Sequence, residues 1–254
     1  MKTTLILTAA LLAASAASAQ ITIDQNRALA GNVTPGDAPG FPVTLSAPGS
    51  YKLTGNLTVP AETKGIVITG EGVTLDLNGF TIKGPSSCTR DLNTRAVACS
   101  YVSVASVGID ASDSDSVEVR NGSIRGFGGV GVVPGRLGHY DHLRITQNSQ
   151  GVYHTDAGNA GPGNTFANSL FATNQTVGLA MHVGLVINSR AINNGSSGFS
   201  AGSSKVLVAD SQTMGNRNYG LYAGAARGTQ STDNGTNKAY VNSMGGNLDG
   251  GTPY

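Results

Sequence analysis

The chain has 254 residues, a formal net charge of +1 and a charged fraction of only 12%. Because an ordinary soluble domain is about one quarter charged, this composition disfavours a basic nucleic-acid-binding face, an acidic tail and a charge-rich coiled coil. The 36 glycines, about twice the average usage, occur in a chain that is 39% hydrophobic, so we expect a folded, turn-rich protein rather than a disordered one.

The first nineteen residues have the pattern of a secretory signal peptide. Lys2 supplies a positive start, Leu5–Ala14 is an apolar run too short to span a bilayer, and Ala17-Ser18-Ala19 offers a small-residue cleavage site. We therefore predict a secreted protein, periplasmic or extracellular. No later segment has about eighteen consecutive apolar residues, so no membrane span is expected.

Residues 20–50 are predicted to form an N-terminal cap and a connector. Asp24 is a candidate N-cap, good helix formers follow it, and Gly31 is a stop signal. This pattern predicts a short capping helix. Residues 32–48 are rich in proline and glycine, which is typical of a connecting segment.

Residues 51–244 contain a repeat. A glycine followed by an apolar residue recurs six times, and Asn or Asp stands ten residues before each of the last five glycines, which are spaced by 20, 27, 20 and 22 residues. So short a unit cannot bury its apolar side alone, whereas stacked units bury a continuous core. We therefore predict an all-β parallel solenoid of about eight coils. The glycine pairs are Gly108-Ile109, Gly131-Val132, Gly151-Val152, Gly178-Leu179, Gly198-Phe199 and Gly220-Leu221, and the polar residues are Asn121, Asp141, Asn168, Asn188 and Asp210.

Two stretches carry a resemblance to a known family. Tyr51–Val59 reads YKLTGNLTV and Gly72–Gly79 reads GVTLDLNG. Together with the repeated Asn-Ser and Asp-Ser turns, they resemble the right-handed, single-stranded parallel β-helix proteins of the pectate-lyase-like superfamily, in particular secreted bacterial members without an assigned activity. The resemblance covers residues 51–240 and implies the fold, but it says little about chemistry because one fold hosts many functions.

Two stretches exceed the repeat length and are predicted to be insertions. The first, at residues 85–107, carries Cys88 and Cys99, which we expect to form a disulfide in an exported chain. The second lies near residues 156–164. Long connections in a solenoid often border a binding site. Residues 245–254 are expected to be a flexible tail, and nothing in the sequence indicates a C-terminal cap.

The repeated Asn and Asp residues are predicted to occupy tight turns, where they tolerate a left-handed backbone. We expect Asn168 and Asn188 to stack with their side chains turned into the coil. Asp141 falls at the same position, within His139–His142, a stretch similar to the aromatic-x-Asp-His stretch of pectate lyases. Because the tryptophan usual in that stretch is missing, we interpret Asp141 as a turn residue.

An outward column of side chains is the predicted ligand face. Because a strand alternates sides, the residue after each glycine should point inward and the next residue outward. Tyr153 and Tyr222 would then lie three rungs apart, about 14 Å at about 4.8 Å per rung. The column resembles the ligand-facing sheet of polysaccharide-active relatives, and the two tyrosines would be platforms for a sugar chain. The alternative is that tyrosine simply favours strands.

Asp110, Asp156 and His182 are the candidate catalytic residues. A carboxylate and a histidine can act as acid and base. Asp110 and Asp156 should lie about 10 Å apart, near the roughly 6.5–9.5 Å of an inverting glycosidase pair. His154, one step beyond Tyr153, should instead point inward. The alternative for these residues is a solvated polar position on a turn.

The sequence gives no reason to expect a cofactor. Asp113 and Asp115 could supply oxygen ligands to Ca²⁺, but the glycine and glutamate of a calcium loop are missing. We therefore expect a secreted β-helix protein that binds an extracellular polysaccharide, with cleavage by a lyase or hydrolase reaction as a further hypothesis. The alternative is a non-catalytic surface scaffold or adhesion module.

Overall fold

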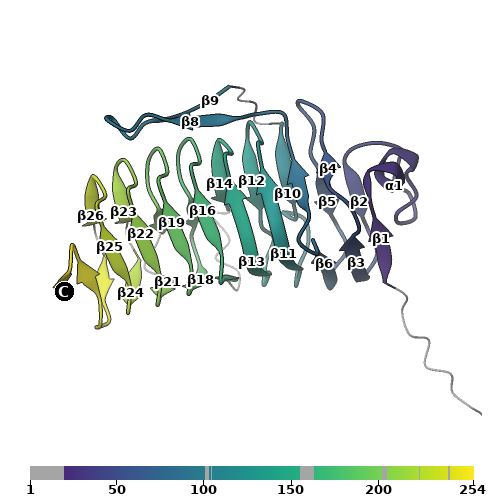
Figure 1. The fold of residues 1–254 in the computed structure, drawn as a ribbon. Helices are drawn as coiled ribbons and strands as arrows, with labels where there is room; N and C mark the ends of the chain where they lie inside the picture. Colours follow the sequence, from purple (N-terminus) through teal and green to yellow (C-terminus); the bar gives the residue numbers. More distant parts are fainter. Residues whose placement is uncertain are drawn as a thin grey trace, which may run out of the picture.

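The computed structural model describes residues 20–254 apart from 101, 102, 104, 155–162, 202–204, 223 and 240. The chain winds into a parallel β-solenoid whose coils stack in a row, with one short helix at the N-terminal end (Figure 1). The predicted signal peptide, residues 1–19, lies outside the described part.

A nine-stranded parallel sheet, here sheet B, takes one strand from each coil. We predicted about eight coils; the additional rung is β2, which lies in the stretch predicted to be a connector. The strands are β2 (Val43–Leu45), β5 (Ile66–Ile68), β10 (Val107–Asp110), β12 (Val130–Val133), β14 (Gln150–Tyr153), β17 (Leu179–Met181), β20 (Phe199–Ala201), β23 (Tyr219–Tyr222) and β26 (Thr236–Ala239).

An eighteen-stranded sheet, here sheet A, takes two segments from most coils, joined through a bend. The segments before the bend are β1 (Ile21–Ile23), β3 (Gly49–Leu53), β6 (Val73–Asp76), β15 (Asn164–Ala167), β18 (Gly184–Ile187), β21 (Val206–Ala209), β24 (Ala225–Arg227) and β27 (Asn242–Ser243). Those after it are β4 (Leu57–Thr58), β7 (Thr81–Lys83), β16 (Leu170–Ala172), β19 (Arg190–Ile192), β22 (Gln212–Met214), β25 (Gln230–Thr232) and β28 (Leu248–Asp249). Two strands run through the bend, β11 (Glu118–Arg125) and β13 (His139–Thr146), and β29 (Thr252–Pro253) is antiparallel to β28.

The repeated glycine at the start of the sheet B strands has a steric cause. A Cβ built on Gly131 would lie 2.7 Å from the carbonyl oxygen of Gly151, and one built on Gly178 would lie 2.7 Å from that of Gly198. Only a hydrogen atom fits where successive coils approach so closely. The glycine repeat therefore marks one rung of the stack, as predicted.

The interior is filled by the inward residues of every coil. The apolar residues that follow the repeated glycines are all buried, which confirms the predicted alternation. Aromatic rings continue the stack from coil to coil: Tyr140 lies flat on Phe166 with 4.5 Å between ring centroids, and Phe171 meets Phe166 and Phe199 edge-on. Burial on this scale holds together units that could not fold singly.

One turn row, which we call the covered edge, lies in the turns that lead from sheet A to sheet B. It consists of the buried Asn148, Asn174, Asn194 and Asn216 and the half-buried Asn234. The side chain of Asn194 accepts hydrogen bonds from the backbone N–H and the amide of Asn174, at 3.1 and 3.0 Å. It donates to the carbonyl of Phe171 at 3.1 Å and to Oδ1 of Asn216 at 2.9 Å. Each amide thus ties three consecutive coils together. We did not predict this row from the sequence.

A second turn row, the open edge, follows the bend of sheet A and contains Asn121, His142, Asn168, Asn188 and Asp210, all with positive φ. Asn188 and Asn168 stack as predicted, with Nδ2 donating to Oδ1 at 2.6 Å, but both side chains are exposed. The prediction that they turn into the coil is therefore wrong. The buried hydrogen bonds of the bend come from the next residue, a serine, and Ser189 Oγ accepts from the backbone N–H of Ser169 at 3.1 Å.

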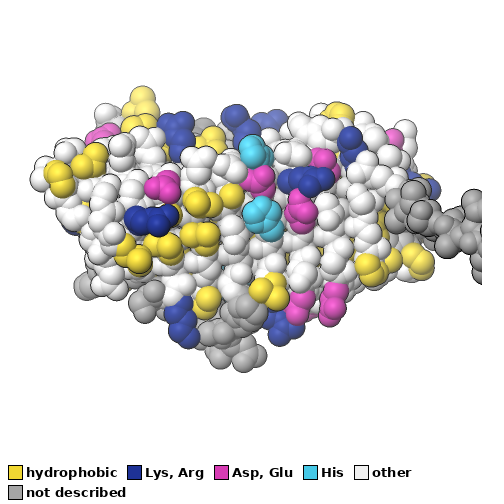
Figure 2. All heavy atoms as spheres, turned by 90° about the horizontal axis from the view of Figure 1, so that it is seen from below, with side chains coloured by type: hydrophobic (Ala, Val, Ile, Leu, Met, Phe, Trp, Pro, Cys, Tyr) yellow, Lys and Arg dark blue, Asp and Glu magenta, His cyan; other side chains and the backbone are white. Residues whose placement is uncertain are grey.

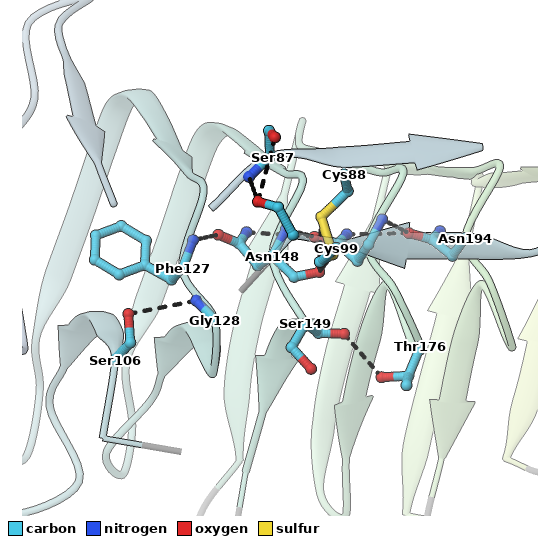
Figure 3. Close-up of a disulfide and its surroundings, with 12 residues drawn as sticks. Ser87, Cys88, Cys99, Ser106, Phe127, Gly128, Asn148, Ser149, Thr176 and Asn194 are labelled. Atoms are coloured by element: carbon cyan, nitrogen blue, oxygen red, sulfur yellow. Dashed lines mark hydrogen bonds between the residues drawn. A yellow bond between two sulfur atoms is a disulfide. The ribbon is translucent and has the colours of Figure 1, made fainter. Parts of the chain in front are cut away.

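The first insertion forms a hairpin that runs along the covered edge, over the turns of successive coils (Figures 1 and 3). Its strands β8 (Cys88–Arg90) and β9 (Val97–Cys99) are antiparallel, and Cys88 and Cys99 form the predicted disulfide. Arg90 donates to the carbonyl of Gly215 at 2.9 Å, and Arg95 pairs with Asp233 at 2.7 Å. The hairpin therefore reaches coils more than a hundred residues ahead in the sequence.

Both ends of the solenoid are capped. The predicted helix is α1 (Gln25–Ala30), whose N-cap Asp24 accepts from the backbone N–H of Arg27 at 2.8 Å. At the other end β28 and β29 form a small antiparallel hairpin, although we expected a flexible tail without a cap. Lys238 Nζ lies 3.1 Å from the centroid of the Tyr254 ring, which anchors the last residue.

Candidate functional site

The predicted outward column exists on sheet B. Strand register pairs Tyr153 with Ala180, Ala180 with Ser200 and Ser200 with Tyr222, so the two tyrosines lie three rungs apart as predicted. Tyr153 is 40% exposed, whereas Tyr222 is half-buried. This column therefore offers one open aromatic surface and one partly covered one.

A third ring enlarges the Tyr222 end of the column. The Tyr219 and Tyr222 ring centroids are 4.9 Å apart with the planes tilted by 44°. We did not single out Tyr219 in the sequence, although the pattern Tyr-x-x-Tyr within one strand is visible there. The pair supplies a broader aromatic surface than a single ring.

Asp110 lies in the same outward column but is only 8% exposed. Its Oδ2 is 2.6 Å from Lys64 Nζ, and its Oδ1 accepts from the backbone N–H of Ser112 at 3.1 Å. Burial raises the pKa of the Asp110 carboxyl, but the hydrogen bonds from Lys64 and Ser112 lower it by more, so this pKa lies below its usual range. A carboxylate held in this way stays ionised and suits an electrostatic role better than that of a proton donor.

The structure does not bring Asp110 and His182 together. Three rungs separate the column position of Asp110 from Ala180, and His182 follows Ala180 by two residues. The separation along the axis is therefore about 14 Å. Asp156, the third candidate, lies outside the described residues. His154 is half-buried with a buried Nδ1, in agreement with its predicted inward position.

The assignment of Asp141 to the turn is off by one residue. The residue with positive φ is His142, and Asp141 ends the segment before it. Asp141 Oδ2 lies 2.6 Å from His142 Nδ1, and Oδ1 accepts from Asn168 Nδ2 at 2.7 Å. Burial raises the pKa of Asp141, while the hydrogen bonds from Asn168 and His142 lower it by more, for a net pKa below its usual range. Asp141 thus braces the open edge.

The two aspartates considered for Ca²⁺ have different surroundings. Asp113 is exposed, whereas both oxygens of Asp115 accept hydrogen bonds from Arg136 at 2.7 Å. Among the residues that the structure describes, no group of three or more His, Cys, Asp or Glu side chains is arranged to hold a metal ion. The Asp115 oxygens are engaged by a cation already present in the chain.

A groove that we did not predict runs along the open edge. Three hollows of about 290, 330 and 290 Å³ follow one another there. Arg144 lines the first two, and Asn188 and Arg190 line the last two, so the hollows are continuous. Figure 2 shows the neighbouring face, where basic side chains lie along the upper rim above a mixed group of acidic, basic and histidine side chains.

Comparison with known proteins found no matching family, no matching curated protein and no matching solved structure. None of the described helices is long and apolar enough to cross a membrane. The assignment to the parallel β-solenoids therefore rests on the strand register of the structure itself.

Proposed function

We propose that this chain is a secreted β-helix protein of the pectate-lyase-like type that binds an extracellular polysaccharide along the outer face of sheet B. One observation carries the proposal. Tyr153 presents an open ring in the same outward column as Tyr222, and the column runs along the axis of the solenoid. Aromatic rings spaced along a line suit stacking against successive sugars of an extended chain.

Binding is the activity that the described residues support, rather than cleavage. The Asp110 carboxylate is engaged by Lys64, and His182 is about 14 Å away along the axis. Acid–base catalysis needs both groups within hydrogen-bonding reach of the reacting atoms. The proposed role of Asp110 and Lys64 is to fix the local shape of the ligand face.

The test is a binding screen of the purified mature protein against neutral and acidic polysaccharides, in parallel with an assay for new reducing or unsaturated ends. For a glycan that binds, Tyr153→Ala and Tyr222→Ala should each lower the affinity about two- to tenfold, since an aromatic contact is worth about 0.5–1.5 kcal/mol. Ser200→Ala, in the same column, is the matched control and should change the affinity less than about twofold.

Three outcomes would count against the proposal. If the parent protein binds none of the glycans, the scaffold alternative gains. If the Tyr153→Ala, Tyr222→Ala double variant binds as the parent does, the ligand face is elsewhere. If new ends form and His182→Ala or Asp156→Asn abolishes them with binding retained, the protein is an enzyme. A melting temperature close to that of the parent is required of each tyrosine variant.

A further inference from the structure

The second segments of sheet A carry an uninterrupted set of cations on their outer face. Lys83, Arg125, Arg144 and Arg190 are exposed and come from β7, β11, β13 and β19. The strand order is β7, β11, β13, β16 and β19, so four of five consecutive rungs contribute a positive charge. The segments Thr81–Lys83, Ser123–Arg125, Arg144–Thr146, Leu170–Ala172 and Arg190–Ile192 contain no acidic residue. Although the chain has almost no net charge, these five segments carry only positive charge, and we call their outer face the cationic strip.

These four cations differ in their pairing from several other arginines of the chain. Arg120, Arg136 and Arg227 each lie within 4.0 Å of a carboxylate. Within the described parts of the chain, Lys83, Arg125, Arg144 and Arg190 make no ion pair, and Arg190 contacts only the neutral side chain of Gln212, through Nε at 3.1 Å. Their charge is therefore available to a ligand.

Register places the charges in two parallel columns. Lys83 pairs with Arg125 on the adjacent rung, which spaces them by about 4.8 Å. Arg144 and Arg190 both pair with Leu170, from opposite sides, and are therefore two rungs apart, about 10 Å. The columns stand on either side of the first hollow, which Arg125 and Arg144 line together with Thr81, Ser123, Thr146 and Gln147.

We propose that this strip and the first two hollows of the open edge, whose linings include no acidic residue, form a second binding site, for a linear polyanionic glycan whose acid groups are carboxylate or sulfate. Arginine forks bind such oxyanions in a bidentate manner. The hydroxyl and amide groups between the arginines offer partners for the sugar hydroxyls. The groove follows the solenoid axis over several rungs, so it fits an extended chain rather than a compact ligand.

The strip favours a glycan over the other common polyanions. Its five segments carry no outward aromatic residue, whereas single-stranded nucleic acids are usually held by stacking of the bases on such rings. Among the residues that line the first two hollows, Leu170 is the only large apolar side chain that is not buried, and it is half-buried. Proteins that bind at a lipid interface insert a continuous apolar surface, and the strip has no such surface. The site is separate from the tyrosine column and does not rest on the function proposed above.

The experiment measures binding of the mature protein to alginate as the carboxylated probe, dextran sulfate as the sulfated probe, dextran as the neutral probe and single-stranded DNA as the competing polyanion. Arg125→Gln with Arg144→Gln removes two charges beside the first hollow. Arg217→Gln, with an exposed arginine on the covered edge, is the control for charge alone.

We expect alginate or dextran sulfate to bind more tightly than dextran, and the better of the two identifies the acid group. The double variant should lose at least tenfold in affinity and show a shallower salt dependence, because fewer ionic contacts are screened. Arg217→Gln should stay within about twofold of the parent. Equal binding by the parent and the double variant would overturn the proposal, and so would tighter binding of DNA than of either acidic glycan.

Discussion

Asn194 and Asn188 lie six residues apart in one coil, yet their side chains are in opposite environments. Asn194, on the covered edge, is fully buried, and its side chain takes part in four hydrogen bonds to its neighbours. Asn188, on the open edge, is exposed and stacks on Asn168 in solvent. Asparagine therefore links neighbouring coils through buried hydrogen bonds on the covered edge, whereas on the open edge its side chain makes only an exposed contact.

The two edges also differ in what lies over them. The disulfide hairpin runs along the covered edge, where the sulfurs of Cys88 and Cys99 lie 4.0 and 3.7 Å from the carbonyl oxygen of Asn148 (Figure 3). Along the open edge, the hollows are lined mainly by polar and cationic side chains, and the third hollow also contains Asp210. One edge is thus built for cohesion between coils, and the other leaves its polar groups available to ligands.

The largest expected effect is at Asn194. Asn194→Leu would leave the backbone N–H of Asn174 and the carbonyl of Phe171 without these partners inside the protein. Each unsatisfied buried group costs about 1–3 kcal/mol, so we expect a loss of about 2–6 kcal/mol in the free energy of unfolding, measured by denaturant titration.

The matched change on the open edge is Asn188→Gly. Glycine keeps the positive φ of the bend, and Gly228 already occupies the equivalent place two coils further on. We expect a change within about 0.5 kcal/mol. If the two substitutions cost the same, the distinction between the edges is wrong.

The next largest effect is expected from the disulfide. Replacing Cys88 and Cys99 together by Ser opens a link that spans eleven residues, which the chain-entropy model values at about 2–3 kcal/mol. Because the hairpin also holds Gly215 and Asp233 through Arg90 and Arg95, its release should expose the turns beneath it.

Hydrogen exchange is the measurement for this variant. Faster exchange should be confined to the hairpin and the covered edge, and the amides of sheet B should keep their protection. Uniformly faster exchange throughout the chain would show that the hairpin supports the whole solenoid rather than one edge.

The sequence predicts features that each coil needs for itself. The glycine repeat can be recognised in the sequence because the close approach of neighbouring coils imposes the same steric limit on every rung. Once the glycine positions are known, the alternation of inward and outward residues gives the outward column. The direction of the asparagine side chains cannot be predicted from the sequence, because asparagine suits an exposed left-handed turn and a buried hydrogen-bonded ladder equally well. The Asp141 position was misplaced because its turn is shorter: Asn148 precedes Gly151 by three residues, whereas Asn174 precedes Gly178 by four.

Contacts between coils that involve residues outside the repeat pattern escaped prediction. Lys64, the partner of Asp110, is 46 residues away from it in the sequence. The cations of the strip are separated by 42, 19 and 46 residues, and the charge count of the chain gives no sign of them. Only the strand register brings these side chains together, so the tyrosine column could be predicted and the cationic strip could not.

The smallest expected effect is a pH dependence of the open edge. The Asp141 carboxylate accepts hydrogen bonds from Asn168 and His142, and its pKa in the folded protein lies below the value of 3.8 that it has without these partners. The unfolded chain therefore binds the proton more tightly. The stability that Asp141 contributes is complete above about pH 4, and it is lost as the pH falls through the folded pKa.

The measurement compares the melting temperatures of the parent and of Asp141→Asn from about pH 5 to about pH 2. Because the carboxylate is partly exposed, the difference in stability at pH 5 should be below about 1 kcal/mol, and it should shrink as the pH falls. The destabilisation caused by Asn194→Leu should stay constant over the same range, since the ladder of the covered edge is made of amides that do not titrate. If instead the Asp141→Asn difference does not change with pH, the carboxylate does not brace the bend, and the open edge is held by its backbone and its serines alone.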